Sequence, residues 1–325
     1  MRGGAILSFE EHILQGPAID SPPVNDGVED LMRKMAARIV RHVRTQQRCV
    51  TAVPRLSLHR RTAPTEPCTT TYQPSLIVVA QGRKQVDLGR NSFVYDSTRF
   101  LLTSLDLPIL SRVTEASEEF PCLAMMLRLR METVREVLGS SDLDQLANSA
   151  EGPAIITGSN TPGLIDACNR LVALLDNPED IPFLARLIER EIIYRLLHGP
   201  EGARLRAIAT RGDNSHRAAG AISWLCANYT KPLRIAELAG TAGMAVSTFH
   251  HHFRTLTAMS PLQYQKQLRL QHAHVLMLVE RLDAAQAAFA VGYESTSQFS
   301  REYSRFFGQP PRRNVKALQS PTAAA

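Results

Sequence analysis

One pattern occurs twice in the last third of the chain. The stretches LRIAELAGTAGMAVSTFHHHFRTL (233–256) and LDAAQAAFAVGYESTSQFSREYSRFF (282–307) align at an offset of 49 up to a shared glycine, and at 50 beyond it. Gly243 then matches Gly292, and Phe249 matches Phe299. Small residues ahead of the glycine allow close helix packing, and glycine itself accepts the positive φ of a tight turn. The repeat predicts two units of helix, glycine turn and second helix.

The second helix of each unit has an apolar side and a polar side. At about 100° per residue, Phe249, Phe253 and Leu256 share one side of the first such helix, and Phe299, Tyr303 and Phe306 share one side of the other. The polar side of the first carries Ser247, His250, His251 and Arg254. That of the second carries Ser297, Gln298, Ser300, Arg301, Ser304 and Arg305.

Three adjacent histidines, His250 to His252, raise the question of a metal site. Adjacent residues on a helix splay apart, whereas helical metal pairs need a spacing of four residues. We therefore predict no metal site here, a structural role for His252, and outward positions for His250 and His251. The five cysteines include no CxxC pair, which favours reduced thiols and argues against a zinc finger.

The net positive charge of the chain comes from the same region. From Asp213 onward there are twelve Lys and Arg against six Asp and Glu, whereas the preceding 212 residues hold 25 of each. A neutral larger part joined to a basic smaller part indicates a nucleic-acid-binding module, although a solvated basic face is the plainer alternative.

The larger part changes pattern along its length. Residues 1–28 are interpreted as a loose leader, and Leu31, Met35, Ile39 and Val43 mark an amphipathic helix. Short apolar runs up to residue 130 predict a β-sandwich or barrel. Residues 131–212 are predicted to be a helical connector ending in a linker, GPEGARLRAIATRGDNSH. Its apolar stripe at Leu184, Ile188, Ile192 and Leu196 fits either dimerisation or packing within the domain.

Two long stretches carry a family resemblance. Within residues 215–316, SPLQYQKQLRLQHAHVLM and AAFAVGYESTSQFSREYSRFFGQPPRR resemble the DNA-binding domain of AraC/XylS-type bacterial transcription regulators. YQPSLIVVAQGRKQVDLGRNSFVYDSTRFLLTSLDLPILSRVTEAS is similar to the cupin-like N-terminal domain of one subgroup. The expected fold is an N-terminal cupin-like β-barrel (29–130), a helical connector (131–212) and an all-α double helix-turn-helix domain (213–325).

The resemblance also assigns positions that face DNA. These are Ser247, His250, His251 and Arg254 in the first unit, and Thr296, Ser297, Gln298, Ser300 and Arg301 in the second, with Ser295 as the helix cap. Arg and Gln suit paired base contacts, while Ser and Thr more often bind phosphate. The chain departs from the family at Met259, where glycine is usual, and at Ala245, whose missing cap oxygen costs roughly 1 kcal/mol.

Together with the resemblance, these observations predict a cytoplasmic, sequence-specific transcription regulator that binds double-stranded DNA. The resemblance further implies that its N-terminal domain senses a small molecule, which the sequence does not identify. RNA polymerase and a second copy of the chain are further candidate partners. No cofactor, no membrane association and no catalytic activity are predicted. Residues 50–130 hold one histidine, His59, and no HxH pair, and the chain lacks GxxxxGK[ST], GxSxG and HExxH motifs. The alternative is a cupin-type metabolite-binding or catalytic protein with only nonspecific DNA contact. The sequence does not distinguish an activator from a repressor.

Overall fold

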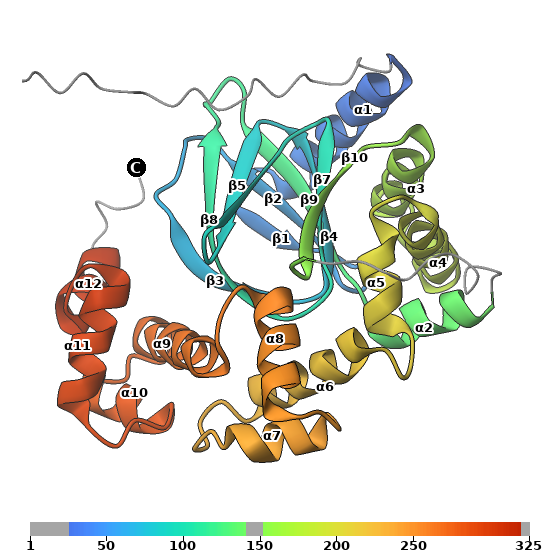
Figure 1. The fold of residues 1–325 in the computed structure, drawn as a ribbon. Helices are drawn as coiled ribbons and strands as arrows, with labels where there is room; N and C mark the ends of the chain where they lie inside the picture. The colour runs from blue at the N-terminus through green and yellow to red at the C-terminus, as the bar shows by residue number, and fades with distance from the viewer. Residues whose placement is uncertain (1–25, 141–151, 320–325) are drawn as a thin grey trace, which may run out of the picture.

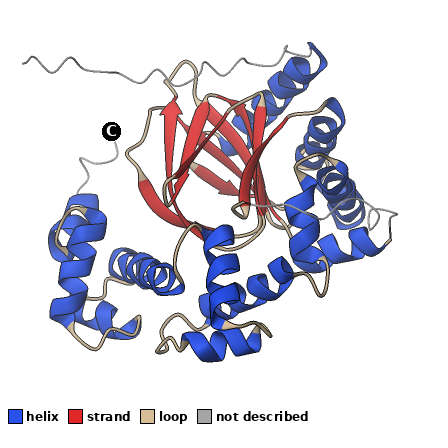
Figure 2. Cartoon of the chain, viewed as in Figure 1, coloured by secondary structure: helices blue, strands red, loops and turns tan. Residues whose placement is uncertain are grey.

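The computed structural model of the chain describes residues 26–140 and 152–319 (Figure 1). A β-structure of two sheets lies at the centre, and helices cover its right and lower sides in the view of Figure 2. None of the described helices is long and apolar enough to cross a bilayer.

One sheet has six strands in the order β1-β2-β9-β4-β7-β10, and its neighbouring strands are antiparallel. Residues alternate between its two faces. Leu76 and Val78 join the core under the helices, whereas Ile77 and Val79 face the second sheet. The strands are β1 (Arg48–Val50), β2 (Leu56–Arg61), β4 (Ser75–Gln81), β7 (Arg99–Thr103), β9 (Cys122–Arg128) and β10 (Ile155–Ser159).

The second sheet has four strands in the order β3-β8-β5-β6. It contributes Val86, Leu88 and Ile109 to the interior between the sheets. The predicted N-terminal β-barrel is therefore confirmed as two facing antiparallel sheets. The strands are β3 (Cys68–Tyr72), β5 (Arg83–Leu88), β6 (Asn91–Tyr95) and β8 (Leu107–Glu115).

The predicted amphipathic helix is α1 (Asp26–Val43). Met35, Ile39 and Val43 are buried against the six-stranded sheet as predicted, and Leu31 is half-buried. The helix begins inside the predicted leader, because Val28 is also buried and extends the apolar stripe by a turn. The other leader residues, 1–25, lie outside the described part of the chain.

The predicted helical region contains α2 (Met131–Gly139), α3 (Pro162–Ala173), the 3-10 turn η2 (Pro178–Asp180), α4 (Ile181–His198) and α5 (Gly202–Ala209). Two features differ from the sequence prediction. Strand β10 interrupts the helices, because Ile155–Ser159 pair with β7 at the sheet edge. The predicted linker contains α5, whose Leu205 and Ile208 are buried.

The α4 stripe lies inside the chain. Ile188, Ile192 and Leu196 are buried in the core shared with α3 and the six-stranded sheet, and Leu184 packs at its edge. Intradomain packing therefore accounts for this stripe. A different side of α4 is exposed, with Phe183, Leu187 and Tyr194 in solvent.

The predicted repeat is confirmed by the C-terminal helices. Each unit is a short helix, a glycine turn with positive φ (63° at Gly243, 89° at Gly292) and a second helix. Helix α9 joins the units. The helices are α6 (Asn214–Ala227), α7 (Ile235–Thr241), α8 (Val246–Thr257), α9 (Pro261–Val279), α10 (Ala284–Ala290), α11 (Thr296–Phe307) and α12 (Pro311–Gln319).

The predicted inner faces of α8 and α11 are nearly correct. Phe249, Phe253 and Leu256 are buried, as are Phe299 and Tyr303. Phe306, the predicted counterpart of Leu256, is only half-buried, because it borders a groove between α9 and the β5–β6 turn.

Hydrogen bonds dock the first unit onto the β-structure. The Ala154 N–H donates to the Leu256 carbonyl (2.8 Å), and the Tyr264 hydroxyl donates to the Asp106 carbonyl. On α9, the Gln271 side-chain oxygen accepts from the Thr71 hydroxyl at 2.7 Å. The buried apolar cluster between the sheets continues into this unit, whereas the second unit has a cluster of its own.

We expect Phe299→Ala to lower the free energy of unfolding by about 3–5 kcal/mol, because it empties a fully buried position. Phe289→Ala, at a position 59% exposed on α10, is the matched control and should change it far less. Urea denaturation of the full chain measures both. Equal losses for the two variants would contradict the assigned core.

Candidate nucleic-acid interface

Helix α8 presents a polar surface from the first unit. Its N-cap is Ala245, and no side-chain oxygen caps the helix. Ser247, His251 and Arg254 are exposed, and His250 is half-buried. Arg254 makes no ion pair with any described carboxylate, so its guanidinium is available to an external anion.

The histidine triplet does not converge. His251 and His252 have ring centroids 5.3 Å apart with planes inclined by 77°. His252 is half-buried, and desolvation, reinforced by the neighbouring His251, lowers its pKa. Among the described residues, no group of three His, Cys, Asp or Glu side chains is arranged to hold a metal ion. Burial thus disfavours the charged form of His252, which lies on a side of α8 within reach of the charges of Asp213 and Arg217.

Helix α11 presents the corresponding surface from the second unit. The Ser295 hydroxyl accepts a hydrogen bond from the Gln298 N–H at 3.3 Å, which is the predicted cap. Ser297, Gln298 and Arg301 are exposed, whereas Thr296 and Ser300 are half-buried. Arg301, like Arg254, makes no ion pair within the described ranges.

A hydrogen-bond network that the sequence did not predict holds the side chain of Gln298. The Gln298 amide donates to Glu302 at 3.3 Å, and Glu302 also accepts from the Tyr293 hydroxyl (2.9 Å) and Lys266 (3.1 Å). Burial alone would raise the pKa of Glu302, but these hydrogen bonds outweigh it and lower that pKa. Lys266 lies on α9, so no local spacing could have paired it with Glu302.

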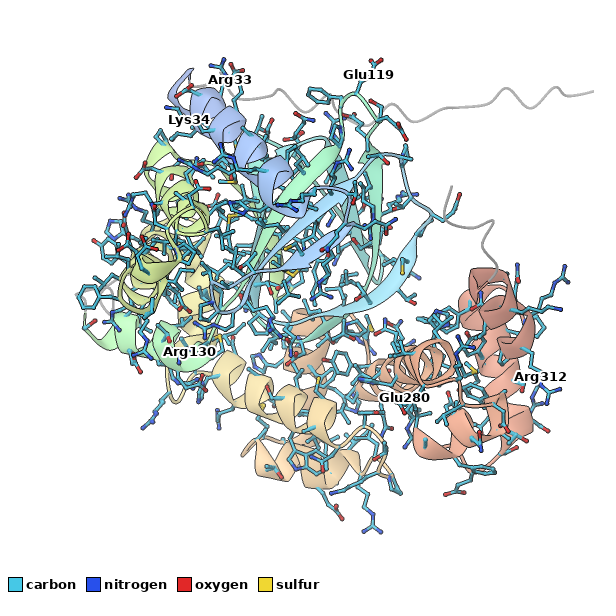
Figure 3. All side chains as sticks on the ribbon, turned by 180° about the vertical axis from the view of Figure 1, so that it is seen from behind. Arg33, Lys34, Glu119, Arg130, Glu280 and Arg312 are labelled. Carbon is cyan, nitrogen blue, oxygen red and sulfur yellow. The ribbon has the colours of Figure 1, made fainter. Side chains whose placement is uncertain are left out.

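Further cations accompany the predicted residues on the second unit. Arg305 is exposed one helical turn beyond Arg301. Arg312 and Arg313 are exposed in the first turn of α12, and Figure 3 shows Arg312 projecting into solvent. The charge excess of the C-terminal part could have pointed to them, since phosphate contacts need a cation but no particular helical position.

Helix α9 carries both surfaces. Ser260 and Gln263 form a reciprocal capping box at its start, and α8 and α11 both pack against it (Figure 1). The side chains of Gln265 and Arg269 donate hydrogen bonds of 2.7–3.0 Å to the carbonyls of Tyr229, Thr230 and Lys231.

The loop held by α9 also touches the second unit. A Cβ added to Gly292 would lie 2.1 Å from the Thr230 carbonyl oxygen, so the glycine turn is packed directly on this loop. At 1.5 Å per residue, the 19 residues of α9 span about 28 Å. The two polar surfaces are thus held at a set separation.

Both the N-terminal and the C-terminal part of the chain match known protein families. Residues 52–204 match the AraC-type transcriptional regulator N-terminus, and residues 238–316 match a helix-turn-helix domain. The HTH-type transcriptional regulator ExsA of Pseudomonas aeruginosa is 27% identical over 50% of this chain and 58% of its own length. The virulence regulon transcriptional activator VirF of Yersinia enterocolitica is 26% identical over 50% of this chain and 60% of its own. The chain therefore spans about three fifths of these curated relatives.

The fold is also shared with a solved structure. ToxT from Vibrio cholerae strain SCE256, solved with unsaturated fatty acid bound, superposes with a TM-score of 0.52 at 10% identity. The match covers 80% of this chain and 94% of ToxT, so it includes the β-structure and the helical domain. The two domain matches, in the expected order and on a two-domain fold shared with ToxT, bear out the resemblance to AraC-type transcriptional regulators.

Proposed function

We propose that this chain is a sequence-specific transcription regulator that binds double-stranded DNA through α8 and α11. One observation carries the proposal: two repeated helices each expose an arginine without an ion-pair partner in the described chain, and both pack on α9. Exposed basic side chains on a helix that follows a tight turn are suited to the major groove.

The ten predicted residues divide by chemistry. Arg254 and Arg301 can donate two parallel hydrogen bonds to guanine, and Gln298 can pair with adenine once Glu302 releases its amide. His250 and His251 can bond either base edges or phosphates. The hydroxyl residues suit phosphate, with Ser295 also capping its helix; they are Ser247, Ser295, Thr296, Ser297 and Ser300.

Each of the three regions of the chain is assigned one role in this proposal. Residues 29–130, extended by β10, would form the sensing domain for a small-molecule effector, as the fatty acid named with ToxT suggests. Residues 131–212 would connect it to the DNA-binding part, 213–325. We also propose a cytoplasmic location, no catalytic activity and contact with RNA polymerase. VirF is a transcriptional activator by name, and we propose the same role for this chain.

A homodimer is the remaining partner proposal. Phe183, Leu187 and Tyr194 recur every four or seven residues along α4 and are 73%, 52% and 45% exposed. These spacings place them on one side of the helix, away from the buried stripe. An exposed apolar row of this kind is suited to contact with its counterpart in a second copy.

Arg301→Ala should weaken binding to a DNA site selected from a random library by about 1–3 kcal/mol and relax base preference at one position. Arg313→Ala on α12 is the charge-matched control. It should weaken selected and random DNA alike and reduce the salt slope by about one. Fluorescence anisotropy across a salt series measures these quantities. If Arg301→Ala weakened the selected and random duplexes equally, its base-reading role would be rejected.

Leu187→Glu should weaken self-association at least about tenfold, because burying a leucine contributes roughly 1.5–3 kcal/mol. Val279→Glu, at a 75% exposed position on α9, should leave association unchanged. Sedimentation velocity over a concentration series distinguishes them. A wild-type chain that stays monomeric throughout the series would refute the dimer.

A further inference from the structure

Part of the space between the two sheets is basic rather than apolar. On β5, Lys84 alternates with the buried Val86 and Leu88, so it shares their inward face. On β2, Leu56 and Leu58 belong to the core under the helices. The alternate residues of β2, Ser57, His59 and Arg61, therefore face the second sheet.

The neighbouring edge strand adds another cation to this face. Arg48 of β1 pairs directly with His59 of β2, and paired residues of antiparallel strands project to the same side. A cavity of about 380 Å³ lies between β1, β2 and β9 on one side and β3, β5 and β8 on the other. Its charged and titratable side chains other than Tyr and Cys are all basic: Arg48, His59, Arg61, Lys84, Arg112 and Arg128.

No acidic residue offsets these cations at the cavity. Its lining contains neither Asp nor Glu, and within the described ranges no carboxylate lies in ion-pair distance of its arginines or of Lys84. Desolvation, followed by the charges of Lys84, Arg48 and Arg61, lowers the pKa of His59 to about 3. Like charges so placed repel one another unless an anion or water separates them.

One buried hydrogen-bonding group at the cavity has no partner. The Ser75 hydroxyl is buried and makes no hydrogen bond with any of the described residues. Ser75 lines the cavity, is 1% exposed, and alternates along β4 with Ile77, which faces the second sheet. A buried polar group without a partner costs free energy, so this hydroxyl favours a polar occupant.

We infer that this cavity binds a compact organic anion bearing carboxylate or phosphate groups, held by Lys84, Arg61 and Arg48. Its volume lies in the range of small-molecule sites. Beside its cations, the cavity is lined by hydroxyl and amide side chains, among them Thr65, Thr70 and Gln73, which can hydrogen-bond a carboxylate or phosphate. Val113, Ala124 and Met126 add apolar contacts for the carbon skeleton of such an anion. The inference rests on the proposed sensing role of the N-terminal domain and specifies the chemical class that it would sense.

Thermal denaturation of the full chain, titrated with citrate or inorganic phosphate against sodium chloride of equal ionic strength, tests this inference. A saturable rise in Tm is expected with at least one of the two anions. Lys84→Met should raise the midpoint concentration roughly tenfold or more, the effect of losing one charge-assisted contact. Arg60→Met removes one charge from the opposite face of β2 and should leave the midpoint unchanged.

Arg48→Met, at the exposed edge strand, is a second variant in case Lys84→Met does not fold, and it should also weaken binding. A wild-type chain without a saturable response, or equal responses in the Lys84 and Arg60 variants, would overturn the inference. Saturation by oleate alone would reject the compact class. Binding to the selected DNA site, measured on the same samples, shows separately whether the proposed regulator function holds.

Discussion

The hydrogen bonds from Gln265 and Arg269 to the carbonyls of residues 229–231 fix the geometry on which the DNA-binding surface depends. Both donors, the Gln265 amide and the Arg269 guanidinium, lie on α9. The loop that they hold includes Thr230, and the carbonyl of Thr230 packs against Gly292 of the second unit. A side chain at Gly292 would be both strained by its φ of 89° and blocked by this carbonyl. Each unit thus limits the movement of the other through one loop.

The same helix connects the DNA-binding surface to the N-terminal domain. Tyr264 and Gln271 of α9 bond to the Asp106 carbonyl and to Thr71, which lie on or beside strands of the four-stranded sheet. Thr71 also lines the basic cavity. An occupant that shifts β3 would therefore act on α9 directly, and a shift of α9 changes the relation between α8 and α11. Contiguous packing of this kind is a physical route by which a ligand could bias DNA binding.

The buried and exposed sides of α8 and α11 could be predicted from the sequence, because they depend only on the helical repeat. Phe249, Phe253, Phe299 and Tyr303 are buried because a 3.6-residue repeat places them on one side of each helix, and Arg254 and Arg301 are exposed for the same reason. The Ser295 cap follows from its place before α11. Pairings between distant segments gave no such signal: β10 with β7, Glu302 with Lys266, and the inward cations of β1, β2 and β5. Helix α5 was missed because glycine, proline and aspartate on both sides of it resemble a linker.

We propose that one chain holds α8 and α11 at a separation that matches successive major-groove segments on one side of the duplex. Hydroxyl-radical footprinting of the full chain on its selected DNA site tests this most directly. Two protected patches per chain are expected about 10 base pairs apart, which is one helical turn of DNA. A single patch, unchanged when α11 is altered at Arg301, would show that the second unit does not engage the duplex and would rule out binding through both helices.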